Sequence, residues 1–108
     1  MNATRFLTGL ALASVLSAPA WAGDTTLTLK DHKFTPAELH VKANQATTIQ
    51  FVNNDDTAEE FDSTALKVEK VVGGHSQGNV HIRALAPGKY PFMGEYHTAT
   101  AQGVVIAE

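Results

Sequence analysis

Short runs in which polar and apolar residues alternate constrain this chain more than any other feature. In residues 25–30, 39–42 and 47–53 the apolar side chains fall at every second position, which is the period of a β-strand that buries one face. Turn formers separate such runs, most clearly at Pro87-Gly88. About seven short strands, with turns roughly every 8–12 residues, predict an all-β fold, an antiparallel β-sandwich.

The expected strands follow the alternation and end at turn formers. They cover residues 25–34, 39–42, 47–53, 59–63, 79–85, 89–94 and 103–107. Residues 66–72 also alternate, and they fit either one strand or a short helix followed by a strand. Within this pattern His32, His40 and His81 are expected to face solvent, and His75 follows a pair of glycines in a turn.

The chain contains no cysteine, and this limits both its stability and its chemistry. Small exported domains commonly depend on disulfides, so this domain must rely on a well-patterned apolar core. Without a thiolate it cannot form a blue-copper site. The net charge is −3 and the lysines and arginines do not cluster, so we set nucleic-acid binding aside.

Residues 1–22 have the features of a secretory signal peptide. Arg5 provides a positive charge, residues 6–15 form a short apolar run, and Ala20-Trp21-Ala22 fits the small-x-small cleavage rule. The apolar run is shorter than the roughly 20 residues that span a bilayer. We therefore expect cleavage after Ala22, export to the periplasm without a membrane anchor, and one small domain over residues 23–108.

The final hairpin gathers three candidate metal ligands within a few residues. Met93, Glu95 and His97 follow an aromatic strand that contains Tyr90 and Phe92. Neutral histidine is the commonest metal ligand, a carboxylate with an imidazole suits copper(II) or iron, and a thioether adds tolerance for copper(I). Strand alternation points Met93 outward, and a lone loop histidine is more often solvated than bound. The three side chains together nevertheless indicate a metal site.

Glu59 is the fourth candidate ligand, and strand alternation gives its direction. Phe61 should point inward, so Glu59 should face the same way at the mouth of the strand, while Glu60 and Asp62 face outward. An inward carboxylate needs a partner, because an unpaired buried charge is costly. That partner is a lysine, an arginine or a metal ion, unless Glu59 is simply solvated at the rim.

Motifs along nearly the whole of residues 23–108 resemble the cupredoxin family. They are Phe34-Thr35-Pro36, Leu39-x-Val41, Ile49-x-Phe51-x-Asn53-x-Asp55, Pro87-Gly88-x-Tyr90-x-Phe92 and Gly103-x-Val105. The resemblance implies a Greek-key β-sandwich with a mononuclear copper site at one end. Glu59 stands at the family's first histidine position, Gly94 at its cysteine position and His97 at its second histidine position. The axial methionine position falls near Ala101 or Gln102, so only His97 keeps a family ligand.

Two shorter motifs, at the ligand-bearing positions, are similar to a narrower group. Residues 59–63 read Glu-Glu-Phe-Asp-Ser and residues 94–97 read Gly-Glu-Tyr-His. They are similar to the periplasmic cupredoxin component of Ftr-type bacterial ferrous-iron uptake systems and, less closely, to the cupredoxin domain of EfeO-like proteins. This resemblance implies that the partners are a periplasmic iron-binding protein and an inner-membrane iron permease, and that the role is oxidation of Fe(II) to Fe(III) before transport.

The sequence thus predicts a cysteine-free cupredoxin with copper as its metal and iron as its substrate ion. Its metal ligands are predicted to be Glu59, Met93, Glu95 and His97. One alternative is a non-catalytic metal-binding or partner-docking module, and another is a structural sandwich whose carboxylates are solvated. Ferrous oxidation by the copper-loaded protein separates the first prediction from the first alternative.

Overall fold

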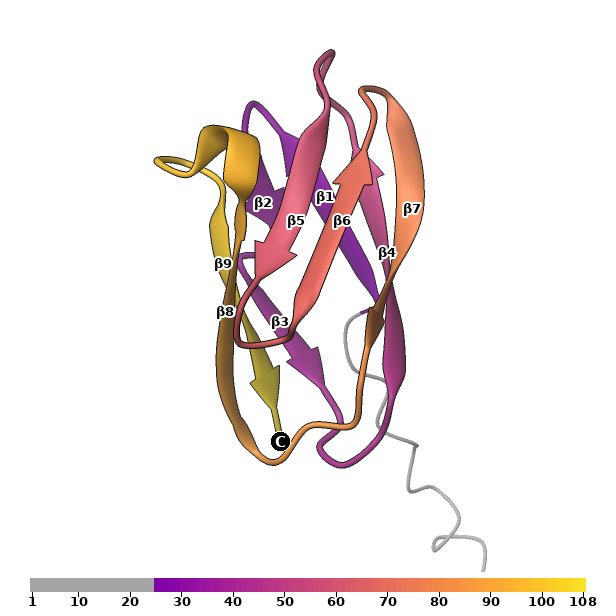
Figure 1. Cartoon of the computed structure of the whole chain (residues 1–108), viewed down its shortest axis with the longest axis vertical. Coiled ribbons are helices and arrows are strands. Elements are labelled where there is room, and N and C mark those ends of the chain that lie inside the picture. The colour runs from indigo at the N-terminus through magenta and orange to yellow at the C-terminus, as the bar shows by residue number, and fades with distance from the viewer. Residues whose placement is uncertain (1–24) are drawn as a thin grey trace, which may run out of the picture.

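Two β-sheets face each other across an apolar core in the computed structural model, which describes residues 25–108 (Figure 1). The predicted signal peptide, residues 1–22, lies outside the described residues. The described part has nine strands and one short 3-10 helix, η1: β1 (Thr26–Lys30), β2 (Lys33–Thr35), β3 (Glu38–Val41), β4 (Thr47–Asn53), β5 (Glu59–Ser63), β6 (Val68–Val72), β7 (Ser76–Ile82), β8 (Gly88–Gly94), η1 (Glu95–His97) and β9 (Gln102–Ala107). Within that part no helix is long and apolar enough to cross a membrane. The predicted β-sandwich is confirmed.

Both sheets are mixed, which the alternation pattern did not predict. The first sheet has the strand order β2-β1-β4-β7 and the second has the order β3-β9-β8-β5-β6. β1 pairs with β4 and β3 pairs with β9 in parallel, while the other described pairs are antiparallel. Alternation reports which face of a strand is buried. It does not report the direction of the neighbouring strand, so the two parallel pairings were missed.

The first expected strand, residues 25–34, is instead a hairpin of β1 and β2. The chain turns at Asp31 and His32, whose φ angles are +52° and +59°. The Asp55 carboxylate accepts the backbone N–H of Asp31 at 2.7 Å and that of His32 at 2.9 Å. The two hydrogen bonds that fix this turn therefore come from a residue far away in the sequence, and local alternation does not indicate the turn.

The ambiguous stretch over residues 66–72 is a turn followed by β6, without a helix. Leu66 is buried in the turn, and its backbone N–H donates to Ser63 Oγ at 2.9 Å. The Arg83 guanidinium donates to the Leu66 carbonyl at 2.8 Å, and Lys67 has a φ of +59°. These contacts hold a tight reversal, so the alternative that included a helix is wrong.

Four phenylalanines form the centre of the core between the sheets. Phe34 makes edge contacts with Phe51 and Phe92, with ring centroids 5.8 Å and 5.1 Å apart. Phe61 and Phe92 stack with centroids 4.7 Å apart. Aromatic pairs at such distances add about 0.5–1.5 kcal/mol each beyond the burial of their surface. These rings belong to a larger apolar core, which stabilises a domain without disulfides.

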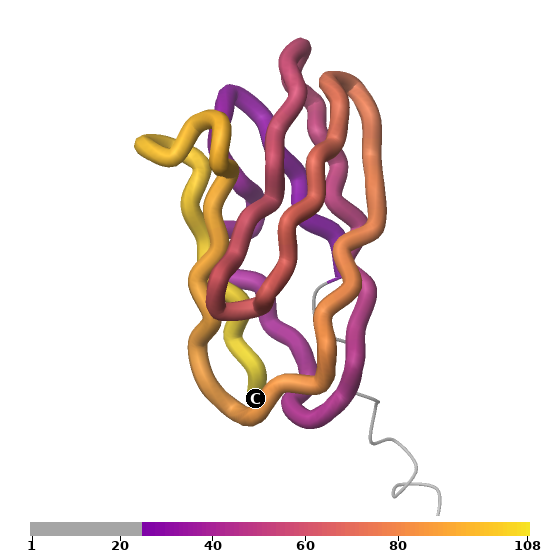
Figure 2. The backbone as a smooth tube through the Cα atoms, in the orientation of Figure 1, coloured from indigo at the N-terminus to yellow at the C-terminus, as the bar shows by residue number. Residues whose placement is uncertain are grey.

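Four connections meet at one end of the sandwich, the upper end in Figures 1 and 2. They are the β1–β2 turn, the β4–β5 loop, the β6–β7 loop and η1. Hydrogen bonds join the first three: the backbone N–H of His75 donates to the carbonyl of Asp55 at 2.9 Å, and the carboxylate of Asp55 accepts from the β1–β2 turn. Side chains far apart in the sequence are thereby presented together.

Candidate metal centre

Glu59 is buried at the start of β5, on the same face as Phe61, as the alternation predicted. Its exposed fraction is 0%, and hydrogen bonds occupy both carboxylate oxygens. Oε1 accepts the backbone N–H groups of Tyr96 at 2.8 Å and Glu60 at 3.1 Å, and Oε2 lies 2.6 Å from His97 Nδ1. The carboxylate has its partners inside the protein, so the alternative of a solvated rim residue is wrong.

His97 ends η1 and turns its ring toward Glu59. Because the carboxylate accepts the proton of Nδ1, the other ring nitrogen, Nε2, is the one that can bind a ligand. Metal-binding histidines are almost always oriented by such a bond from the second nitrogen. The His97 side chain is 26% exposed, which lets an ion from solvent reach it. We call this unit the Glu59–His97 pair.

Gly94, which the sequence resemblance matched to a cysteine position, has no room for a side chain. A Cβ at this position would lie 2.7 Å from Glu59 Cδ, 2.8 Å from Glu59 Oε2 and 2.7 Å from the Cβ of Ala101. No side chain fits at such distances without a shift of its neighbours. The Glu59 carboxylate therefore occupies the room that a thiolate side chain at residue 94 would need.

His32 lies against His97, although the sequence predicted that it faces solvent. The two rings are stacked, with centroids 3.6 Å apart and planes inclined by 13°. His32 comes from the β1–β2 turn and is half-buried. The expectation of a solvent-facing strand residue is wrong, because the turn redirects the side chain toward the end of the sandwich. No local sequence signal marks this contact.

Asp55 holds the turn that carries His32. It is 8% exposed, and its carboxylate receives the N–H groups of Asp31 and His32. Burial acts to raise the pKa of Asp55, but those two N–H groups and the charges of His32 and Lys30 outweigh it and bring the pKa below its ordinary value of 3.8. The buried side chain of Asn53 supports Asp55 in turn, since Oδ1 accepts the Asp55 N–H at 3.0 Å.

Met93 and Glu95 are not brought to the Glu59–His97 pair. Met93 points to the outer face of β8, where it is 38% exposed and lies opposite Asp62 in the register. Glu95 is the first residue of η1 and is exposed. Their roles as metal ligands stay predictions, as do those of Glu59 and His97.

The other histidines lie outside the centre. His40 Nδ1 is 2.7 Å from Glu108 Oε2, and His75 Nε2 is 2.6 Å from Asp56 Oδ1 in an exposed pair. His81 is exposed on β7, as the alternation predicted. These three histidines make none of the hydrogen bonds described above for Glu59.

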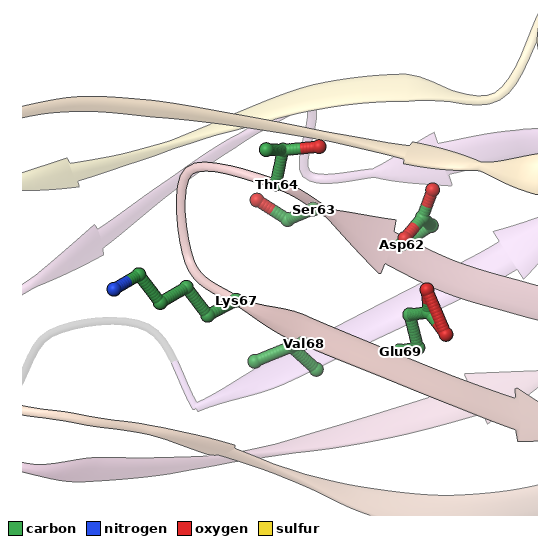
Figure 3. A pocket seen from close by; sticks show the side chains of 6 residues that line it. All are labelled: Asp62, Ser63, Thr64, Lys67, Val68 and Glu69. Carbon is green, nitrogen blue, oxygen red and sulfur yellow. The ribbon is translucent and has the colours of Figure 1, made fainter.

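The outer face of β5 and β6 carries negative charge. A shallow hollow there is lined by Asp62, Ser63, Thr64, Lys67, Val68 and Glu69 (Figure 3). Asp62 lies directly opposite Glu69, which costs stability because like charges repel. Loss of hydration, and then the charges of neighbouring carboxylates with Glu69 foremost, raise the pKa of Glu60 on this face. The hollow does not include Glu59 or His97, so it is separate from the candidate centre.

Nε2 of His97 is the atom of the Glu59–His97 pair that could bind copper, because both carboxylate oxygens of Glu59 are occupied by hydrogen bonds. Within residues 25–108 no group of three or more histidine, cysteine, aspartate or glutamate side chains already stands at metal-binding distances. The described residues do hold the Glu59–His97 pair with His32 stacked beside it. An imidazole nitrogen suits copper(II), and the hydrogen bond between Nδ1 and the buried carboxylate leaves Nε2 of His97 as the ring nitrogen that can bind it.

Comparison with known proteins identifies relatives in sequence. A family model for the cupredoxin-like domain matches residues 5–107. An uncharacterized protein, RP394, of Rickettsia prowazekii (strain Madrid E) is 41% identical over 83 residues, which are 77% of this chain and 66% of that protein. The match thus covers just under two thirds of the length of that relative.

Solved structures share the fold at low sequence identity. A mutant of amicyanin in its Cu(I) form has a TM-score of 0.59 and 22% identity, over 84% of this chain and 88% of that one. The metal-binding domain of the Cu(I)-exporting P-type ATPase CopA of Streptococcus pneumoniae, with Cu(I), has a TM-score of 0.66 and 10% identity, over 79% of this chain and 84% of that one. At such identities these likenesses show the fold alone.

Proposed function

The chain belongs to the family of cupredoxin-like domains, and from this membership we propose that it binds copper at the Glu59–His97 pair and oxidises Fe(II) to Fe(III) in the periplasm. The bonded pair is the observation that carries the proposal. A carboxylate with no exposed surface lies 2.6 Å from the Nδ1 of His97. Met93 and Glu95 remain candidates for further ligands.

Glu59 and His97 have different tasks in the proposed centre. Glu59 holds the imidazole in one orientation, and its negative charge offsets that of a bound cation. His97 presents Nε2 at the partly open end of the sandwich. Copper(II), when bound, supplies the one-electron acceptor that oxidation of Fe(II) requires.

Negative charge near the centre supports a cationic substrate. Loss of hydration, and then the charges of Glu69, Asp62, Glu95 and Glu59, raise the pKa of Glu60, so several carboxylates lie near one another around β5. A surface of one sign raises the local concentration of ions of the other sign, so Fe(II) is attracted to this end of the molecule. Carboxylate oxygens also prefer the harder Fe(III), which favours oxidation of iron held near them.

The predicted signal peptide supports export of the protein, and the motif resemblance supports a proposal about its partners. We propose that residues 1–22 direct the protein to the periplasm and that residues 23–108 act there. The similarity of residues 59–63 and 94–97 to Ftr-type and EfeO-like cupredoxins supports a periplasmic iron-binding protein and an inner-membrane iron permease as partners.

Anaerobic oxidation of Fe(II) by the copper(II)-loaded protein tests the proposed reaction. Each bound copper(II) accepts one electron, so about one Fe(II) should disappear per copper, which a ferrous-specific chelator measures. The His97→Ala variant and the metal-free protein are the controls and should leave Fe(II) unchanged. Tight copper binding without loss of Fe(II) would favour the alternative, a non-catalytic metal-binding or partner-docking module.

A further inference from the structure

We infer that the outer face of strands β8, β5 and β6 is a docking surface for a protein partner that presents lysine or arginine side chains among apolar ones. These strands are neighbours in the second sheet, and β6 forms its edge. The inner face of the sheet packs on the core, so the outer face is turned to solvent. The inference goes beyond the proposed function, because this face is the side of the sandwich and contains neither member of the Glu59–His97 pair.

Exposed apolar side chains alternate with carboxylates on this face. Met93 is 38% exposed and lies opposite Asp62 in the register, and Val71 is 51% exposed and lies opposite Glu60. These two are among the three large apolar side chains that are exposed in residues 25–108. Methionine is enriched at the cores of protein interfaces. The face therefore offers apolar contacts as well as charge.

The carboxylates of this face have no cationic partner in the described chain. Asp62 lies directly opposite Glu69, and after loss of hydration the charges of Glu69 and Asp62 raise the pKa of Glu60, so the three groups are neighbours. The ion pairs within residues 25–108 each contain a histidine and lie elsewhere. Lys67 lines the hollow on this face, but its ammonium group points away from Asp62 and Glu69 (Figure 3). The negative charge is thus left for another molecule to neutralise.

The face is hollowed on both sides of Asp62. The hollow between β5 and β6 has a volume of about 470 Å³, and Asp62, Val68 and Glu69 are in its lining. A second hollow, of about 140 Å³, lies between β5 and β8, and its lining includes Asp62, Pro91 and Met93. A lysine or arginine side chain suits such hollows, because its methylene groups contact the apolar lining while its charged end meets a carboxylate.

Charge selects a basic protein from among the possible occupants. The chain has a net charge of −3, so a second copy would bring one acidic face against another. Nucleic acid and anionic lipid surfaces would be repelled in the same way. A small cation would make no use of the exposed apolar side chains. A basic protein gains from both features, because opposite charges steer its approach and orientation and the apolar side chains are removed from water.

An NMR titration of the metal-free, isotope-labelled protein with a synthetic peptide of alternating lysine and valine tests this surface. The amides that shift should lie on β5, β6 and β8, and added salt should weaken binding. Asp62→Asn/Glu69→Gln should lower the affinity by about 3–10-fold, through loss of two exposed ion pairs. The matched control, Glu38→Gln/Glu108→Gln, removes two carboxylates that surround His40 near the other edge of the sheet, and it should lower the affinity by less than about twofold.

A second peptide, in which serine replaces valine, tests the apolar part of the surface. It should bind the wild type more weakly than the valine peptide does. Val71→Ala should weaken binding of the valine peptide by about 2–5-fold, because less apolar area is buried, and should leave binding of the serine peptide unchanged. Equal affinities of the wild type for the two peptides would overturn the docking surface, since they would show only a general attraction of cations.

The stability of the unbound protein gives an independent test. Like charges directly opposite each other destabilise a sheet, so Asp62→Asn/Glu69→Gln should unfold at a higher urea concentration than the wild type while it binds the peptide more weakly. A lower urea midpoint in this variant would contradict the inference, because the two carboxylates would then serve the stability of the free chain.

The remaining outcomes of the titration also decide the inference. Shifts that gather at η1 or spread evenly over the molecule would overturn it, as would equal losses of affinity in the two double variants. Shifts of the β5, β6 and β8 amides when the protein is concentrated without peptide would assign the face to a second copy instead. Because the protein carries no metal in these experiments, no outcome depends on the proposed copper centre.

Discussion

Gly94 and Glu59 depend on each other for space. The buried carboxylate lies where the side chain of residue 94 would stand, with Glu59 Cδ only 2.7 Å from the position of a Cβ. The same carboxylate receives the Nδ1 proton of His97. A glycine at this position is therefore a condition for the buried carboxylate, and the buried carboxylate is a condition for the fixed imidazole.

Gly94→Ala should destabilise the protein by about 1–3 kcal/mol, because the added methyl group overpacks against Glu59 and Ala101. Urea unfolding followed by circular dichroism measures the change. Gly73→Ala is the matched control, since its nearest neighbour would be Ser76 Oγ at 3.8 Å, and it should stay within about 0.5 kcal/mol of the wild type. Equal stability of the two variants would contradict the crowding at residue 94.

Asp55 should make stability depend on pH at the acidic end. Its pKa in the folded protein lies below the ordinary value of 3.8. Its contribution is therefore fully present above about pH 4 and is lost as the pH falls through the folded-state pKa. The free energy of unfolding should drop over that range in the wild type and drop less steeply in Asp55→Asn. If the free energy of unfolding fell with pH equally steeply in the two proteins, Asp55 would not contribute to the loss of stability in acid.

At the scale of elements, alternation predicted the strands well and their connections poorly. It gave the inward direction of Phe61 and Glu59 and the outward direction of His81. It did not give the turn at Asp31 and His32, because the carboxylate that holds this turn is more than 20 residues away in the chain. Strand faces are a local property of the sequence, whereas turns of this kind depend on tertiary contacts.

The contact between the two sheets should be sensitive to loss of an aromatic ring. Phe61→Ala removes a ring that contacts Phe34 and Phe51 of the opposite sheet in the core, and we expect a loss of about 3–5 kcal/mol. Val71→Ala removes a side chain that is 51% exposed on the edge strand β6, and it should cost less than about 1 kcal/mol. Denaturant unfolding compares the two, and similar losses would contradict the position of the core.

At the scale of the whole molecule, four connections meet at one end of the sandwich. Two of them, the β1–β2 turn and η1, bring His32 and His97 close to Glu59 at the start of β5. The sequence predicted two of its members, Glu59 and His97, from strand alternation and from residue type. It could not predict His32, because the stacking of the two rings depends on how the first hairpin folds back over the sandwich. Met93 and Glu95 are close to His97 in sequence, yet the regular strand and η1 turn them outward.

A copper(II) titration of the wild type and three variants tests the centre most directly, with calorimetry to measure affinity. We expect one tight equivalent in the wild type, an affinity about 10–100-fold weaker in Glu59→Gln and in His97→Ala, and no change in His81→Ala, whose side chain is exposed on β7. The electron paramagnetic resonance spectrum should show nitrogen and oxygen ligands, and the visible absorption spectrum should lack the intense blue band of a copper–thiolate site. Equal affinities in all four proteins would contradict copper binding at the Glu59–His97 pair.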